Sequence, residues 1–147
     1  MSDSSTSILT QHVKAQLGHL AVLREYQRQA DDSYVKSALA LAIEDTQEAI
    51  ARVASRLRQL GQPILDQSLD EAADKLLRQS RSRRGLADQL KFVHHGLKHQ
   101  VEWYNVQLKE LKEDADSQAI FVALAAQTRV RLERWENLMK DMKVPLG

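Results

Sequence analysis

The chain has 147 residues, of which 43% are hydrophobic and 28% charged, which is the size and composition of one domain with its own core. It contains no cysteine, which excludes disulfide frameworks, thiolate metal sites, iron–sulfur clusters and cysteine nucleophiles. Its 21 basic and 20 acidic side chains give a net charge of +1, so we do not expect nucleic acid or anionic lipid as a partner. Because no signal-peptide pattern and no long apolar run is present, we expect a cytoplasmic protein without a membrane partner.

The first half of the chain carries apolar residues at helical spacing and predicts two long helices. Residues 1–7 are small and polar, and we expect a flexible tail that supplies an N-cap at its end. The first helix is expected over about 8–30 and the second over about 34–60. Gly61 is expected to end the second helix, because glycine adopts the left-handed conformation that closes many helices.

The second half begins with a connection and continues with two more long helices. The crossover covers 61–82, and Ser68 with Glu71 has the spacing of a capping box, which predicts a short helix inside it. Single apolar stripes then predict a third long helix over about 83–113 and a fourth over about 117–142.

The lengths of the connections predict the topology. Helices joined by three or four residues must form antiparallel hairpins, whereas the crossover of some twenty residues can pass from one end of a bundle to the other. We therefore expect residues 1–147 to form a single all-α domain, a four-helix bundle of two antiparallel helical hairpins joined by a long crossover with a short helix.

The two predicted hairpins also share a short repeat. The segment from Thr46 to Val53 matches the segment from Thr128 to Trp135, with Thr, an aliphatic residue, Arg and a large apolar residue in corresponding places. With this repeat and this connectivity the chain resembles the ferritin-like superfamily, in particular the small rubrerythrin-type bundles, over about residues 8–142. In that family an E-x-x-H pair in the second and fourth helices, with one Glu from each of the other two, binds two metal ions inside the bundle.

This chain departs from the family at every metal-binding position. Thr46 and Ala49 stand for one E-x-x-H pair, and Thr128 and Arg131 stand for the other. The inward positions of the first and third helices hold Val13 and Gln16, and Lys98 and Gln100, in place of the glutamates. The resemblance therefore implies a bundle without the di-iron centre. We expect no cofactor and no enzymatic activity, but a binding or structural protein, and the apolar stripes leave open whether a cavity replaces the metals.

Three further polar residues lie near the predicted core. Arg131 either reaches an inward acid and forms a buried pair, or lays its stem along the helix interface with its head in water, and we favour the second. His12 and His19 are expected on the flank of the first helix, where they either form a pair of ligands or are satisfied by water or a neighbouring carboxylate, and we favour the second.

A second candidate site lies on the third long helix. His95, His99 and Glu102 have the spacing of one helix face, which is typical of a zinc site or another divalent-ion site. Counted at 100° per residue, this face is opposite the stripe that contains Leu97. It therefore predicts a surface metal site that does not depend on the bundle core.

The same outer face suggests a different use. Phe92, Trp103 and Val106 share or flank it, so the alternative is that this face packs against a second copy of the chain, with the histidines at the polar margin. Ordinary solvent exposure is the third possibility. We favour packing against a second copy of the chain and expect a homodimer.

A cluster of arginines marks the end of the crossover. The side chains are Arg78, Arg81, Arg83 and Arg84, which could grip phosphates or an acidic partner through bidentate contacts. No aromatic residue accompanies them, and the net charge is small, so nucleic acid is not favoured and a solvated basic loop is the simpler interpretation.

Overall fold

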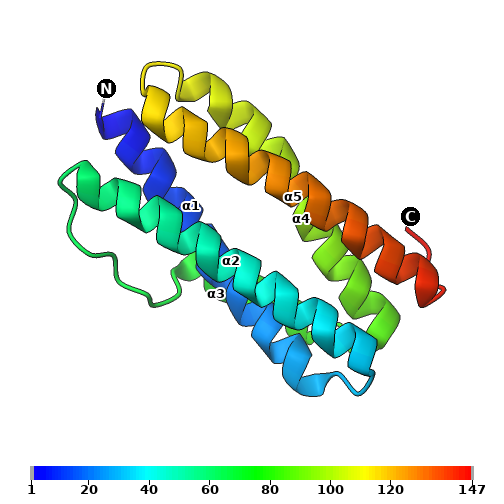
Figure 1. Cartoon of the computed structure of the whole chain (residues 1–147). Coiled ribbons are helices and arrows are strands. Elements are labelled where there is room, and N and C mark those ends of the chain that lie inside the picture. Colours follow the sequence, from blue (N-terminus) through cyan, green and yellow to red (C-terminus); the bar gives the residue numbers. More distant parts are fainter. Residues whose placement is uncertain (1, 147) are drawn as a thin grey trace.

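The computed structural model describes residues 2–146, and all the regular structure in that range is helical (Figure 1). The elements in chain order are α1 (Ser2–Gln29), α2 (Ser33–Gln59), α3 (Glu71–Arg81), α4 (Leu86–Glu110) and α5 (Ala115–Asp141). The prediction of an all-α protein is therefore confirmed. None of these helices is both long enough and apolar enough to cross a membrane.

The four long helices form two hairpins that lie side by side (Figure 1). The most extensive packing is between α1 and α2 and between α4 and α5, while α1 with α4 and α2 with α5 connect the two hairpins less closely. The crossover carries α3, which packs along α1. Tyr26 at the end of α1 donates a 2.8 Å hydrogen bond to the carbonyl of Ser80, and this bond fixes the C-terminal end of α3.

Aspartates begin three of the helices, as expected where backbone N–H groups lack partners. Asp32 accepts a hydrogen bond from the backbone N–H of the third residue beyond it, and Asp70 and Asp114 do the same for α3 and α5. The capping box predicted at Ser68 is therefore wrong, because Ser68 instead closes a local turn with Asp66. Gly61 has φ of 82° directly after α2, as expected for a glycine that ends a helix.

The N-terminal segment differs from the prediction of a tail over 1–7. Helix α1 begins at Ser2, and residue 1 lies outside the described residues. Ser5 is buried and lies beside the carboxyl of Asp114, at the start of α5. Burial alone would raise the pKa of Asp114, but hydrogen bonds from Ser117 and Arg56, together with the nearby Ser5 side chain, outweigh it and lower the pKa to about 2. This contact with the second hairpin explains why the helix continues where local sequence predicts fraying.

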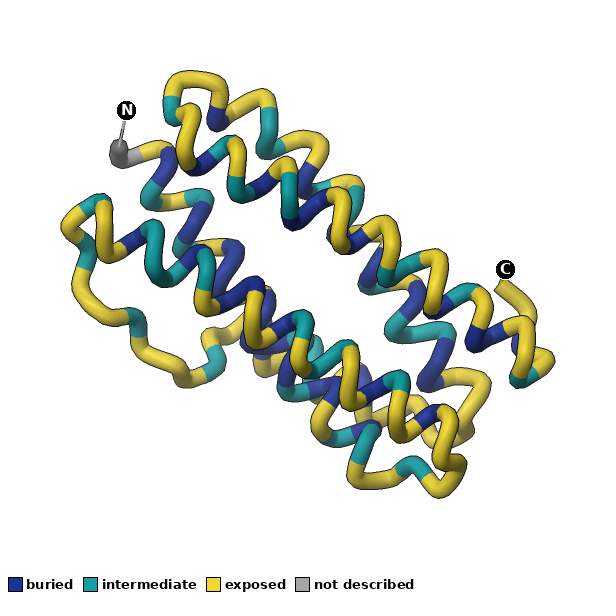
Figure 2. The backbone as a smooth tube through the Cα atoms, in the orientation of Figure 1, coloured by how far each residue is buried: buried dark blue, intermediate teal, exposed yellow. Residues whose placement is uncertain are grey.

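Buried residues recur along each of the long helices (Figure 2). Their apolar side chains form two clusters, one at each end of the long helices. The first lies at the end that holds the α4–α5 turn, and includes Leu9, Val13, Leu17, Val53, Leu57, Tyr104, Phe121 and Leu124. The second lies at the end that holds the α1–α2 turn, and includes Val22, Leu23, Tyr26, Leu39, Leu90, Leu97, Trp135 and Met139. The predicted apolar stripes are therefore inside, but the core is divided at mid-helix.

Candidate functional site

A layer of buried polar side chains separates the two apolar clusters. All four long helices contribute to it at mid-helix, with Gln16, Thr46, Gln100, Thr128 and Arg131. Gln16, Thr46 and Thr128 are at most 3% exposed, and the Arg131 side chain is 11% exposed. These are positions at which the ferritin-like resemblance places metal ligands, and we call this set the polar layer.

One uncharged hydrogen bond of the polar layer joins two helices. The side-chain amide of Gln16 donates to that of Gln100 across the bundle at 3.2 Å. The hydroxyls of Thr46 and Thr128 each donate to the carbonyl four residues earlier in their own helix at 2.7 Å. In residues 2–146 no group of three or more His, Asp or Glu side chains is arranged to hold a metal ion.

His12 lies deeper than predicted. We expected it on the flank of the first helix, but it is 1% exposed, and its Nε2 lies 2.6 Å from the hydroxyl of Tyr104. The rings of Trp103 and Phe121 pack around it at centroid distances of 5.9 and 5.2 Å. Burial first, and repulsion from His19 second, lower the pKa of His12 to about 3, so the ring is neutral at neutral pH.

Arg131 also contradicts the favoured prediction, in which its head reaches water. The guanidinium is held inside, where Nη2 donates to the hydroxyl of Thr46 over a long 3.4 Å and Nε lies 3.9 Å from a carboxylate oxygen of Asp45. Nε makes no hydrogen bond within the chain. Burial lowers the pKa of Arg131, and the charge of Asp45 opposes that change. The alternative of a pair with an inward acid is therefore the observed one, although the pair is loose.

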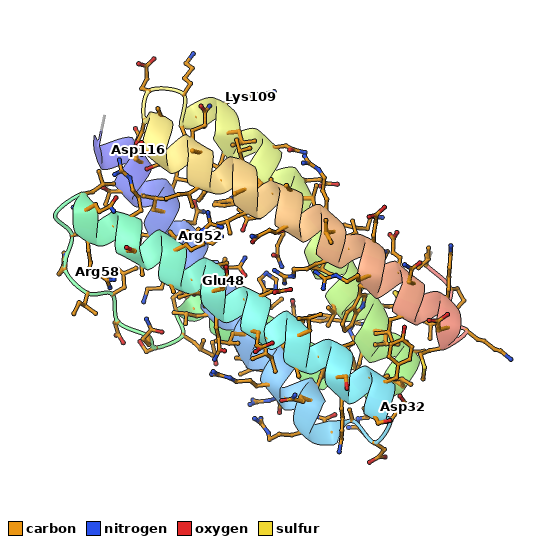
Figure 3. The ribbon with its side chains drawn as sticks, viewed as in Figure 1. Asp32, Glu48, Arg52, Arg58, Lys109 and Asp116 are labelled. Atoms are coloured by element: carbon orange, nitrogen blue, oxygen red, sulfur yellow. The ribbon has the colours of Figure 1, made fainter. Side chains whose placement is uncertain are left out.

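A cavity of about 670 Å³ lies next to Arg131, between the two hairpins. Figure 3 shows that side chains of both hairpins occupy the gap between their ribbons. The lining comes from all five helices and is mainly apolar, with Val22, Leu23, Ala38, Leu41, Leu76, Phe92, Val93, Leu97, Trp135 and Leu138. Leu41 and Tyr34 are 41% and 47% exposed, so the cavity reaches the surface at α2. We call this space the inter-hairpin cavity.

The charged side chains that line the cavity are two arginines and one aspartate. Arg134 lies 3.8 Å from the Asp45 carboxylate that also faces Arg131, so the three groups form one cluster. His19 lies at the same end and is half-buried. Desolvation, followed by repulsion from Arg131, lowers the pKa of His19 to about 4. His19 therefore adds no charge at neutral pH, and the cluster carries one net positive charge.

The predicted metal site on α4 is present only in part. The Nε2 atoms of His95 and His99 lie 3.0 Å apart, and both side chains are exposed as expected. Glu102 does not complete a triad with them, since the described residues contain no cluster of three such ligands. Both histidines line the inter-hairpin cavity, so they do not lie on a face remote from it.

The predicted partner face on α4 is also changed. Trp103 packs against the first apolar cluster and against His12, so its placement on the outer face is wrong. Phe92 is half-buried, meets the ring of Tyr26 at 6.4 Å and lines the cavity. Only Val106, which is 56% exposed, lies free on the surface of α4.

The predicted arginine cluster is largely engaged within the chain. Arg78 pairs with Asp74 and Arg81 with Glu25, each at 3.2 Å. The guanidinium of Arg83 lies over the ring of Phe92, 5.3 Å from its centroid. Arg84 is exposed in the α3–α4 connection.

Sequence reasoning missed two parts of the site. Asp45 was not singled out, although it precedes Thr46 and one residue along a helix is enough to reach the edge of the buried stripe. His94 received no role, but it is buried and its Nε2 lies 2.8 Å from a carboxylate oxygen of Glu136, linking α4 to α5. No sequence signal pointed to that pairing, because the partners are far apart in the chain.

The comparisons with known proteins give no relative. No family model matches the chain, and no curated protein and no solved structure matches it. The class of this protein is therefore defined by the geometry of its fold and site alone. The protein is an all-α chain of two packed helical hairpins with a polar layer at its centre and a cavity beside that layer.

Proposed function

We propose that the protein is a ferritin-like four-helix bundle without the di-metal site, and that it acts as a non-enzymatic binding protein whose ligand occupies the inter-hairpin cavity. The observation that carries this proposal is the combination of the polar layer, with its amides, hydroxyls and guanidinium, and a cavity of about 670 Å³ directly beside it. Carboxylate and imidazole ligands suit a di-iron centre, whereas a guanidinium repels a cation.

The cavity has the properties of a small-molecule site. Its volume falls within the range of about 300–1,000 Å³ that is usual for ligand pockets. Its lining surface is mainly apolar, and polar side chains are spread along it, from Arg131 and Asp45 to Gln79 on α3 and Tyr34 on α2. Apolar surface with several polar groups is typical of sites that bind and orient small molecules. Because the cavity reaches the surface, it can admit a ligand from solution, which favours a binding role over a purely structural one.

The test is binding of the neutral dye Nile red to the full chain, with a variant that fills the cavity. Ala38 lines the cavity on α2, whereas Ala40 on the same helix is exposed and does not line it. We expect saturable binding to the parent chain and to Ala40→Trp, and its loss in Ala38→Trp. Absence of saturable binding to the parent chain, or undiminished binding to Ala38→Trp, contradicts the proposal.

The metal-free part of the proposal has its own test. The purified protein is exposed to ferrous ion and oxygen, and bound iron is measured by elemental analysis on a size-exclusion peak of known mass. We expect no stoichiometric iron and no ferroxidase activity. Two irons per chain would refute the assignment of Thr46, Thr128 and Arg131 to the former ligand positions.

One observation favours a second function, a divalent-ion site on α4. The close approach of the His95 and His99 Nε2 atoms, 3.0 Å apart, suits two ligands of one ion. Zinc binding measured by calorimetry tests this candidate. It predicts stoichiometric uptake that His99→Gln abolishes, and unchanged uptake in that variant excludes it.

We also propose a homodimer formed through the α4–α5 hairpin. Val106 on α4 and Val122 and Val130 on α5 are each about half exposed, and these are the aliphatic side chains that the hairpin would offer to a second copy. Light scattering on a size-exclusion column gives the mass. A monomer at all concentrations refutes the dimer, and Val106→Asp is expected to weaken it.

A further inference from the structure

We infer that the ligand of the inter-hairpin cavity is an amphipathic monocarboxylate. Its carboxylate binds the Arg131 guanidinium at the polar layer, and its apolar body extends along α2 and α5 toward Tyr34. This inference rests on the proposed binding function and assigns the chemistry of the ligand. Three independent observations support it: the hydrogen bonding of Arg131, the charge of the lining, and the shape of the apolar part.

Arg131 is a largely buried guanidinium, with its side chain 11% exposed, and it has few acceptors. It carries five N–H donors in a planar fork. Among the residues that the structure describes it makes one hydrogen bond, of 3.4 Å, to the Thr46 hydroxyl, and its buried Nε has no partner, since Asp45 lies 3.9 Å away, beyond hydrogen-bond reach. A charge removed from water is stable only when it is both paired and hydrogen-bonded. A carboxylate that accepts two parallel hydrogen bonds from the fork satisfies this requirement.

The charge of the lining specifies one negative charge on the ligand. The charged lining side chains are Arg131, Arg134 and Asp45, which leave one positive charge. A monoanion neutralises this charge, whereas a dianionic phosphate group would leave an excess negative charge beside Asp45. A neutral apolar molecule would leave the Arg131 donors without acceptors. The lining therefore favours a singly charged anion, and a carboxylate supplies that charge together with two acceptors for the guanidinium fork.

The rest of the lining fits an extended apolar chain. On α5, Trp135 and Leu138 follow Arg131 by one and two turns on the same face. On α2, the lining runs from Asp45 to Tyr34, a distance of about 17 Å along the helix axis. The antiparallel arrangement places Tyr34 near the far end of α5, where its hydroxyl donates to Asp141 at 2.8 Å. Arg131 and Tyr34 thus lie at opposite ends of a passage whose surface is mainly apolar.

The experiment compares dodecanoate with dodecanol as competitors that displace Nile red at neutral pH. The two molecules share an apolar chain and differ in charge. We expect dodecanoate to displace the dye from the parent chain at a concentration lower by about tenfold or more, because a hydrogen-bonded charge pair inside a protein contributes that much to affinity. Arg131→Gln is expected to remove this preference while dye binding persists, and Arg131→Lys to restore part of it by keeping the charge without the fork.

The matched control is Arg129→Gln. Arg129 is on the same helix, is exposed and donates to Asn105 at 2.9 Å, so its loss should leave the preference intact. Equal displacement by dodecanoate and dodecanol from the parent chain overturns the inference, whatever the stability of the variants. A preference that survives Arg131→Gln overturns it as well. Failure of the dye to bind the parent chain refutes the binding function itself, and so separates the two proposals.

Discussion

Stability should fall in mild acid because two histidines, His12 and His19, have lowered pKa values in the folded chain, and His12 has the larger shift. The pKa of His12 is lowered from 6.5 to about 3 in the folded chain, chiefly by burial. Once the chain unfolds, the imidazole is solvated and its pKa returns to about 6.5. The unfolded state therefore binds a proton below that pH while the folded state does not. The stability is present in full above pH 6.5 or so and is lost as the pH falls toward 3.

The size of the loss follows from the unfolded pKa alone. Between about pH 7.5 and about pH 5 the unfolded histidine gains about 2 kcal/mol from protonation. The folded His12 gains almost nothing, because its pKa of about 3 is well below this window. A folded pKa of His12 one unit higher or lower would leave this change in unfolding free energy nearly the same. We therefore expect His12 to reduce the free energy of unfolding by about 2 kcal/mol over this interval.

The assay is urea unfolding of the parent chain and of His12→Gln at both pH values. The quantity of interest is the change in unfolding free energy with pH, which does not depend on how much the substitution itself destabilises the fold. His12→Gln should reduce that change by about 2 kcal/mol. Tyr104→Phe is the control, since it removes the hydroxyl 2.6 Å from His12 but leaves the ring buried, and should preserve the pH dependence.

An unaltered pH dependence in His12→Gln would show that burial of His12 does not cause the loss of stability in acid. The same conclusion would follow if Tyr104→Phe reduced the pH dependence as much as His12→Gln does. That second result would mean that the hydrogen bond, and not burial, keeps His12 neutral.

Two further predictions concern the packing and the helix ends. Asp114→Ala should lower the unfolding free energy at neutral pH by about 1–2 kcal/mol, because the carboxylate caps α5 and binds Arg56 at 2.9 Å. Because the pKa of Asp114 is about 2, this contribution is present above pH 3.8 and is lost as the pH falls toward 2. The unfolding free energies of the parent chain and of Asp114→Ala should therefore converge near the lower pH. Gly18→Ala should destabilise by about 1–3 kcal/mol in urea unfolding, since its Cβ would lie 2.9 Å from Cβ of Ala73 on α3. Gly96→Ala, whose nearest neighbour would be His19 at 3.4 Å, should be neutral or stabilising by up to about 1 kcal/mol, and equal effects at the two glycines would contradict the packing of α3 on α1.

The helices themselves were predictable because their signals are local. A stripe of apolar residues at helical spacing defines an element and its buried face, and an aspartate or glycine at each end defines its bounds to within a few residues. The N-terminus of α1 is the exception. Ser2 to Ser7 carry no local helix signal, and the helix extends there because Ser5 contacts the start of α5.

The surroundings of the polar residues were predicted less well, because the helical wheel of one helix does not show which side chains of other helices face it. Gln16 and Gln100 were correctly expected to point inward, but nothing in the sequence indicates that their amides meet at 3.2 Å. Arg131 was expected to reach water, which is the cheaper state for an isolated charge. It stays inside because Asp45 and Thr46 on α2 lie opposite, and that proximity arises from the packing of the two hairpins.

The sequence by itself determined the all-helical class, the positions of the long helices and the residues on their apolar stripes, because hydrophobic periodicity and caps act within a few residues of each other. Only the tertiary structure decided that the core divides into two clusters, that a polar layer lies between them and that a cavity opens beside Arg131. These features depend on how four helices are rotated and spaced against one another. That arrangement is set by the sum of many weak contacts between distant residues, which no single segment of the chain encodes.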